Sequence, residues 1–164
     1  MDKNDFLDCM KDFTTRSIGQ MMLPVSDQKD NAGPKERAAD IHLMRLSDSS
    51  AAKKKVPYII LQAIKSEDYQ KPGEDPVSKV TLRSIFAVYN EDEQIGSLSL
   101  LGLMERLRID ILKTVIVGGR YELDIKESKL EQLIYPDNIA PYFGGEMLSV
   151  WKLPPVEREV GQWL

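Results

Sequence analysis

The fold of this chain is decided by the stretch from Ser78 to Gly119, which reads SKVTLRSIFAVYNEDEQIGSLSLLGLMERLRIDILKTVIVGG. Its first part, from Val80 to Tyr89, places Val80, Leu82, Phe86 and Val88 on one face, the pattern of a strand that lies on a core. A short acidic turn follows. From Leu100 to Val115 the apolar residues recur at spacings of three and four, which is typical of an amphipathic helix. The stretch therefore predicts a strand and a helix that packs on a sheet.

Both ends of this helix carry terminal signals. Ser97 or Ser99 can accept a hydrogen bond from the free amides of the first turn. Gly118 and Gly119 can adopt the left-handed backbone that ends a helix. We expect the helix over Ser99–Thr114, with its buried face formed by Leu101, Met104, Leu107 and Ile111.

The segments around this stretch predict further elements. Helical spacing over Asp5–Met22 predicts a first helix, which Pro24 ends. The strands expected from β-branched content and alternation are Pro57–Ile64, Arg120–Ile125, Leu130–Tyr135 and Gly145–Leu153. The polar segment Ser66–Pro76 is expected to be an exposed loop that joins two antiparallel strands. This order predicts an α+β fold with a mainly antiparallel sheet of four to five strands and helices packed on one face.

The length of 164 residues and an apolar content of 42% are sufficient for one domain with one core. We divide it into an N-terminal helix over 1–23, a long mobile loop over 24–56, an α+β core over 57–155 and a tail over 156–164. The loop is assigned from its Ser, Asp, Lys, Asn, Gly and Pro content, interrupted by one apolar cluster at residues 41–44. A connection of this length in a compact domain is usually functional or disordered.

The residues available for chemistry are few. His42 is the only histidine and lies in the expected loop, which disfavours histidine-based catalysis. Cys9 is the only cysteine, so neither an internal disulfide nor a zinc site built from several cysteines can form. The acidic run at residues 90–96 has Ile95 where a calcium loop needs glycine. We therefore predict no catalytic residues, no metal site and no cofactor.

A protein without a chemical site acts through its surface. Acidic residues and one tyrosine cluster in the expected loop at Ser66–Pro76, and further aromatic residues lie near the last strand and in the tail. Tyrosine and tryptophan bury a large area with few rotatable bonds, which favours them at interfaces. The residues predicted to form an interface are Glu67, Asp68, Tyr69, Lys71, Glu74, Asp75, Tyr142, Phe143 and Trp163.

The charge pattern gives no strong indication of a partner. The formal net charge is −4, from 26 acidic and 22 basic residues, which disfavours an anionic membrane or extended nucleic acid. No apolar run reaches the length of about 20 residues that spans a membrane. The acidic N-terminus is unlike a secretion signal, so we expect an intracellular protein. The competing class is an enzyme or a small regulatory protein of a mobile element, with Lys53–Lys55, Arg106, Arg108 and Arg120 forming a basic patch that binds nucleic acid.

Five short motifs together resemble a known group of proteins. They are PYII at 57–60, FAVYN at 86–90, LLGLMERLR at 100–108, PYFGGEM at 141–147 and WKLP at 151–154. The set is similar to small tail terminator or tail completion proteins of long-tailed phages and prophages of Gram-positive bacteria. The likeness extends from Pro57 to Pro155, about two thirds of the chain.

The resemblance implies a structural role and no catalytic residue. It implies a sheet with helices on one face, and subunits that assemble as a homohexameric ring on the last ring of the tail tube. The implied partners are further copies of the chain, the tail tube protein and the head–tail connector proteins, with DNA passing through the ring. The implied location is the virion tail, and the host cytoplasm during assembly. A head completion protein of similar size is the alternative within this class.

Overall fold

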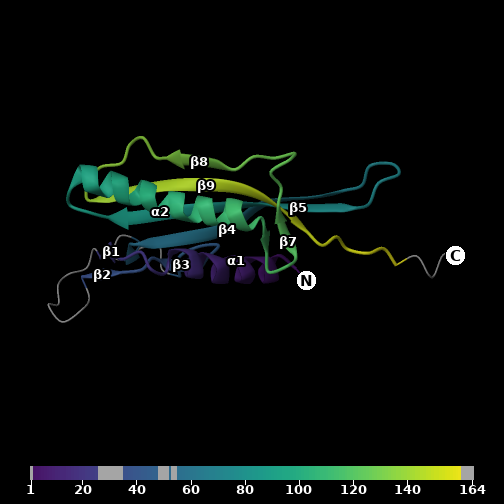
Figure 1. Ribbon diagram of the computed structural model, residues 1–164, viewed down its shortest axis with the longest axis horizontal. Coiled ribbons are helices and arrows are strands. Elements are labelled where there is room, and N and C mark those ends of the chain that lie inside the picture. Colours follow the sequence, from purple (N-terminus) through teal and green to yellow (C-terminus); the bar gives the residue numbers. More distant parts are fainter. Residues whose placement is uncertain (1, 26–34, 48–51, 53–54, 160–164) are drawn as a thin grey trace.

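The computed structural model describes residues 2–25, 35–47, 52 and 55–159. Figure 1 shows the helices lying along a long, twisted sheet. The helices are α1 (Lys3–Ile18) and α2 (Glu93–Thr114). The strands are β1 (Leu23–Pro24), β2 (Glu36–Arg37), β3 (Asp40–Leu43), β4 (Tyr58–Tyr69), β5 (Val77–Tyr89), β6 (Ile116–Val117), β7 (Tyr121–Leu123), β8 (Glu131–Ile134) and β9 (Tyr142–Leu153).

The predicted α+β class is confirmed, but the sheet is wider than predicted and is mixed. Within the described residues it has seven strands in the order β3-β4-β5-β9-β7-β6, and β8 pairs with β9 beside this path. All pairs are antiparallel except β3 with β4, which is parallel. Strands β1 and β2 form a separate small sheet. The prediction of four to five antiparallel strands missed the short strands β3 and β6.

Strand β3 corrects the expectation of a continuous loop over 24–56. Its residue Ile41 lies opposite Ile59 of β4, and both are buried. Without β3, the edge of β4 would present unpaired backbone groups, so a short apolar segment gains hydrogen bonds by lying along it. Leu46 is buried as well. Residues 26–34, 48–51 and 53–54 lie outside the described residues, and mobility of the segment stays a prediction.

Helix α1 confirms the predicted first helix, with a shorter C-terminal end. A capping box between Asp2 and Asp5 starts it, because each side chain accepts a hydrogen bond from the other residue's backbone amide. Phe6 of this helix contacts Tyr121 edge to face at 5.2 Å between ring centroids, and Trp151 at 6.0 Å. These three aromatic residues are fully buried and join α1 to strands β7 and β9.

Helix α2 begins earlier than predicted. Asp92 caps it by accepting a hydrogen bond from the Ile95 amide at 2.9 Å, so neither Ser97 nor Ser99 is the cap. An acidic side chain at this end is also favoured by the helix dipole. The helix ends at Thr114, followed by Val115 with a φ of 61°. The glycines predicted to end it lie instead in the turn between β6 and β7.

The buried face of α2 differs from the predicted one by about one residue. Met104, Leu107 and Ile111 are buried as predicted, but Leu101 is 41% exposed. Leu100 and Leu103 take its place in the core. The helix carries apolar residues around most of its circumference, so spacing alone did not decide which ones face the sheet.

The long strands β5 and β9 separate an inner face from an outer face. On the inner face, alternate residues such as Phe86 and Met147 are buried, and both helices contact this side of the sheet. The intervening residues, such as Arg83, Ile85 and Leu148, are half-buried and lie on the outer face, which the helices do not cover. The core of the molecule therefore lies between the inner face and the two helices.

Candidate interaction surfaces

The predicted loop at Ser66–Pro76 is a β-hairpin arm. Strand β4 continues to Tyr69, which lies opposite Val77 of β5, so Glu67, Asp68 and Tyr69 are strand residues and not loop residues. The connecting turn contains Lys71-Pro72-Gly73-Glu74, in which the Glu74 amide donates to the Lys71 carbonyl at 3.0 Å and Gly73 has a φ of 76°. Pro-Gly at the two central positions is the sequence of a type II turn. We call residues 66–78 the arm.

The arm projects beyond the end of β9. The last pair that β9 forms with β5 joins Leu153 to Ser78. In Figure 1 the arm and the C-terminal segment leave the body at the same end. Arg158 of that segment donates to the Gln70 side chain at 2.8 Å. An open hollow of about 470 Å³ lies between the two segments, lined by Tyr69, Val77, Pro155 and Val156 among others.

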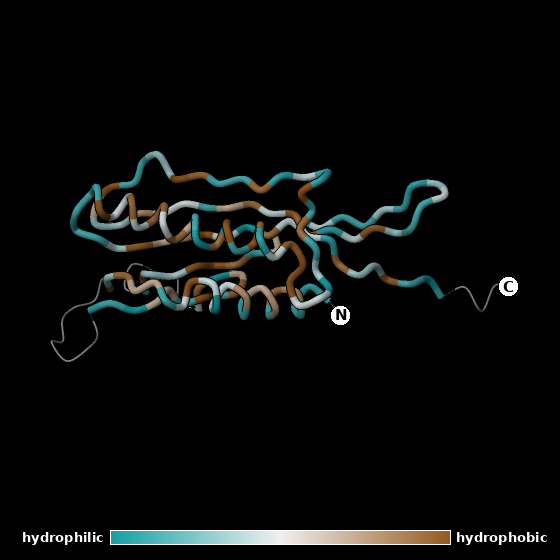
Figure 2. The backbone as a smooth tube through the Cα atoms, viewed as in Figure 1, coloured by the Kyte–Doolittle hydropathy of each residue, from teal (hydrophilic) through white to brown (hydrophobic). Residues whose placement is uncertain are grey.

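The acidic residues of the arm differ in their pairing. Glu67 forms an ion pair with Lys65 at 2.8 Å, and this hydrogen bond lowers the pKa of Glu67. Asp68 accepts a hydrogen bond from Ser78. Glu74 and Asp75 are exposed, and no ion pair within the described part of the chain includes either of them. Figure 2 shows the tip of the arm as a hydrophilic segment. The tip of the arm therefore carries two acidic residues, Glu74 and Asp75, against one basic residue, Lys71.

Tyr69 is less free than the sequence suggested. Its ring is half-buried, and the Lys79 ammonium lies 5.7 Å from the ring centroid. A cation at this distance over an aromatic face is attracted to the ring. Tyr69 therefore connects the arm to the body and leaves part of its ring exposed toward the hollow beside the C-terminal segment.

The remaining predicted interface residues do not join the arm. Tyr142 and Phe143 lie at the start of β9, at the opposite end of that strand. Phe143 is only 4% exposed and packs under Gly96 of α2, so it is a core residue and its assignment to an interface is wrong. Tyr142 is half-buried and contacts Tyr89 at 5.6 Å between ring centroids. Trp163 lies outside the described residues.

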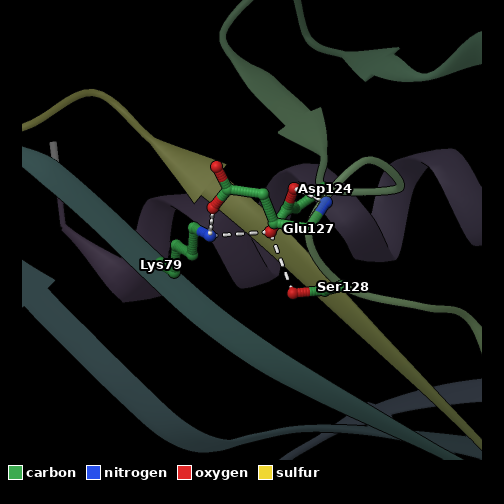
Figure 3. Close-up of polar contacts among 4 residues, drawn as sticks. All are labelled: Lys79, Asp124, Glu127 and Ser128. Atoms are coloured by element: carbon green, nitrogen blue, oxygen red, sulfur yellow. Dashed lines mark hydrogen bonds and ion pairs between the residues drawn. The ribbon is translucent and has the colours of Figure 1, made fainter.

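A buried ion pair fixes the base of the arm. Lys79 of β5 is 8% exposed, and its Nζ lies 2.8 Å from Asp124 Oδ2 and 3.0 Å from Glu127 Oε2. The Asp124 side chain is fully buried and also accepts a hydrogen bond from the Ser128 hydroxyl at 2.9 Å. Figure 3 shows Lys79 pointing from its strand toward both carboxylates. The cluster holds the turn after β7 against the outer face.

The charges of this cluster stabilise one another. The hydrogen bond to Asp124 raises the pKa of Lys79, although burial opposes this shift. Burial acts to raise the pKa of Asp124, but hydrogen bonds from Lys79, Ser128 and the Glu127 amide outweigh it, so this pKa lies below its usual value. The hydrogen bond from Lys79 also lowers the pKa of Glu127. All three groups therefore stay charged at neutral pH.

Sequence reasoning missed this cluster. Lys79 lies at an alternate position of β5, on the face opposite Val80, and Asp124 directly follows the alternating residues of β7. Neither has a local signal that predicts burial, because the two residues meet only when β7 and β5 flank β9. The charged groups of the cluster bind one another. The geometry therefore indicates that the cluster stabilises the fold.

The outer face carries a second charge pair and two adjoining hollows. Arg83 and Glu146, from neighbouring strands, form a half-buried ion pair. Hollows of about 460 and 300 Å³ share Glu131 and Leu148 in their linings. Val150 lies in the lining of the larger one and Leu133 in that of the smaller one. We call this surface, formed by β8, the outer face of β9 and the turn at 126–129, the trough.

The only histidine and the only cysteine of the chain are both partly buried by neighbouring residues. His42 lies in β3, where its ring contacts Tyr58 at 6.2 Å between centroids, and burial lowers its pKa. Burial also raises the pKa of Cys9. Among the residues that the structure describes, no group of three or more His, Cys, Asp or Glu side chains is placed to hold a metal ion.

Two of the basic residues considered for nucleic-acid binding form ion pairs with acidic residues of α2, and two others lie outside the described residues. Arg106 lies 3.6 Å from Asp110, and Arg108 lies 3.1 Å from Glu105, on the same helix. Lys53 and Lys54 lie outside the described residues. Within the described ranges, no helix is long and apolar enough to cross a membrane.

A comparison of the sequence with models of known protein families found no match, and a comparison with curated proteins found none either.

Proposed function

We propose that this protein is a structural subunit of a phage tail, which caps the tail tube and helps to join the tail to the head as a homohexameric ring. The observation that carries this proposal is the arm. It is a two-stranded projection with an exposed, mainly acidic tip, and the buried ion pair at its base stabilises the fold. The resemblance of the motifs at 57–155 to tail terminators supports the same role.

The arm is suited to docking against another ring. Its strands are continuous with the central sheet, and the Lys79 cluster fixes its base, so little conformational entropy is lost when it binds. The exposed acidic residues Glu74 and Asp75 favour a partner with positive charge, and this attraction should weaken as salt screens the charges. In a ring of such subunits, the arms would line one rim or the lumen.

An arm variant tests this role. Tyr69→Ala combined with Asp68→Lys and Glu74→Lys is expected to abolish tail assembly in a complementation assay, with tubes of uncontrolled length or tails that do not join heads. A matched control is Glu91→Lys with Asp137→Lys, which changes two exposed acids that lie outside the arm, one after β5 and one before β9. Both variants should fold, because the changed residues are exposed or half-buried. Infectious particles at the parental level from the arm variant would refute the docking role.

A further inference from the structure

A β-bulge lies in β4 at the base of the arm. Ala63 of β4 pairs with Leu82 of β5, and the next pair joins Lys65 to Thr81. Ile64, which lies between the two pairs, is therefore an extra residue without a partner on β5. The pairing of β5 with β9 passes the same level without a shift, so the irregularity belongs to β4. An extra residue in one strand of an antiparallel pair bends that strand and increases its local twist.

The bulge lies where β4 becomes the edge of the sheet. Strand β3 pairs with the other side of β4, but only along residues 58–61. The Ala63 amide, just before the bulge, donates to the Met44 sulfur at 3.4 Å. Within the described ranges, no strand pairs with this edge of β4 over residues 64–69. The bulge is therefore placed at the point beyond which the body no longer flanks β4 on that side.

The bulge decides which side chains of the arm meet the Lys79 cluster. Glu67 lies opposite Lys79, and the Lys79 ammonium lies over the Tyr69 ring. Residues that lie directly opposite each other share a face of the sheet, so Glu67 and Tyr69 lie on the outer face. If Ile64 paired with β5 as its neighbours do, Lys79 would face Ser66 instead.

The side chain of Ile64 does not account for its position. It is 51% exposed, and the strand residues that follow it are exposed as far as Asp68. Burial therefore does not hold this part of the arm in place. The direction in which the arm leaves the body is set by its backbone pairing and by the contacts at Lys79.

We propose that Ile64 is a positioning residue: the bulge that it forms sets the direction of the arm and thereby places the tip for docking. The inference rests on the proposed function and deepens it, because it separates where the tip points from which residues the tip carries. A projection whose direction is set before it docks loses less conformational entropy on binding. The extra backbone residue carries this role, and the isoleucine side chain does not.

Two variants of chain length test this role. Deletion of Ile64 removes the bulge, and the other pairs between β4 and β5 can remain. Lys65 then directly follows Ala63, just as their partners Thr81 and Leu82 are adjacent in β5. Insertion of one serine after Ile64 enlarges the bulge. The insertion adds a residue at an exposed edge and removes none, so it tests the role even where the deletion lowers stability.

Spin labels measure the direction of the arm. One label is attached at the tip after Glu74→Cys, and the other on the body after Lys113→Cys or Lys126→Cys, with Cys9→Ala to remove the native thiol. The three labelled positions are exposed. In the deletion variant, at least one of the two mean distances should change by about 3 Å or more, the length that one strand residue contributes. In the insertion variant the same distance should change with the opposite sign.

The matched control is Ile64→Ser, which keeps the extra residue and removes the apolar side chain. It should give the parental distances and the parental yield of infectious particles in the complementation assay. The deletion variant keeps every residue of the tip, yet its yield should fall at least about tenfold, because the tip no longer points at its partner. The melting temperatures of the control and the insertion variant should stay close to the parental value, since Ile64 is exposed.

Three outcomes overturn the inference. The first is parental distances in both length variants, and the second is changed distances with a parental yield of particles. The third is self-association of the deletion variant at parental distances. In that case the bulge keeps the free edge of β4 from pairing with another chain.

Failure here and failure of the proposed function are separable. If the variant with the altered tip loses tail assembly while the deletion variant assembles tails, only the role of Ile64 is rejected. If the variant with the altered tip assembles tails normally, the docking role is rejected. The label distances still decide whether the bulge sets the direction of the arm.

Discussion

The inner face of strands β5 and β9 is covered by two helices, whereas the outer face is not covered by them and carries two groups of paired charges. Both faces come from the same alternating strands. On the inner face, Phe86 and Trp151 are fully buried among apolar neighbours. On the outer face, Lys79 is buried only together with Asp124, and Arg83 only in part with Glu146. Stability on one face therefore comes from packing, and on the other from specific pairs.

The largest effect is expected from breaking the pair on the outer face. Lys79→Met leaves the carboxylate of Asp124 buried without its cation, which should lower the free energy of unfolding by about 3 to 5 kcal/mol. Urea denaturation at neutral pH measures this loss. Adding Asp124→Asn to the same variant removes the buried charge and should recover much of the stability. If Lys79→Met unfolds at the parental urea concentration, the pair does not stabilise this face.

The inner face should respond strongly to the loss of packing. Leu107→Ala opens a cavity under α2 and should cost about 2 to 5 kcal/mol, because Leu107 is buried. Leu101→Ala makes the same chemical change on the exposed side of the helix and should stay within about 0.5 kcal/mol of the parent. Thermal melting of both variants compares the two sides. Equal melting temperatures would contradict the orientation of α2.

Two glycines of α2 should respond to the same substitution with opposite signs. A Cβ at Gly96 would lie 2.3 Å from the Phe143 ring, so Gly96→Ala should cost about 1 to 3 kcal/mol even though alanine favours the helix. A Cβ at Gly102 would meet only Met21 Cε at 4.0 Å, so Gly102→Ala should stabilise by up to about 1 kcal/mol. Urea midpoints of the two variants should therefore move in opposite directions. A shared direction would show that the close approach at Gly96 relaxes easily.

The smallest effect is confined to acid pH. The pKa values of Asp124 and Glu127 are lowered in the folded protein. Their contribution to stability is therefore complete above the unfolded pKa values of about 3.9 and 4.3, and is lost as the pH falls through the lower, folded values. Below about pH 4, the parent should lose stability more steeply than the variant that combines Lys79→Met with Asp124→Asn. Parallel pH profiles would mean that other carboxylates dominate the acid response.

The sequence predicted most of the elements of this fold, because their signals are local. Alternation in β5 and β9 and the spacing in α1 and α2 depend on near neighbours along the chain. The first helix, strands β5 and β9 and the order of the helices and long strands were recovered in this way, whereas the short strands β3 and β6 were not. Helix ends were less predictable. Asp92 and Ser99 can both cap a helix. Asp92 is the cap because the helix begins directly after the turn that follows β5.

The candidate surfaces were predicted only in part. The acidic hairpin was recognised from its turn residues and charge, although its strands run further than expected. Phe143 was wrongly predicted to lie at an interface, because the sequence around it does not show that Gly96 of α2 packs against its ring. Leu101 was predicted to be buried because it follows the same helical period as the core residues, but the structure leaves it 41% exposed.

The sequence by itself determined the α+β class, the order of the helices and long strands, and the exposed acidic turn, since these depend on periodicity and on Pro and Gly within a few residues. Only the tertiary structure decided that β3 extends the sheet, that α2 turns Leu100 and Leu103 inward, and that Lys79 meets Asp124. Each of these results depends on residues that are distant in the chain and become neighbours when β4, β5 and β9 align. The free energy that selects them comes from burial and pairing between elements, which no local pattern encodes.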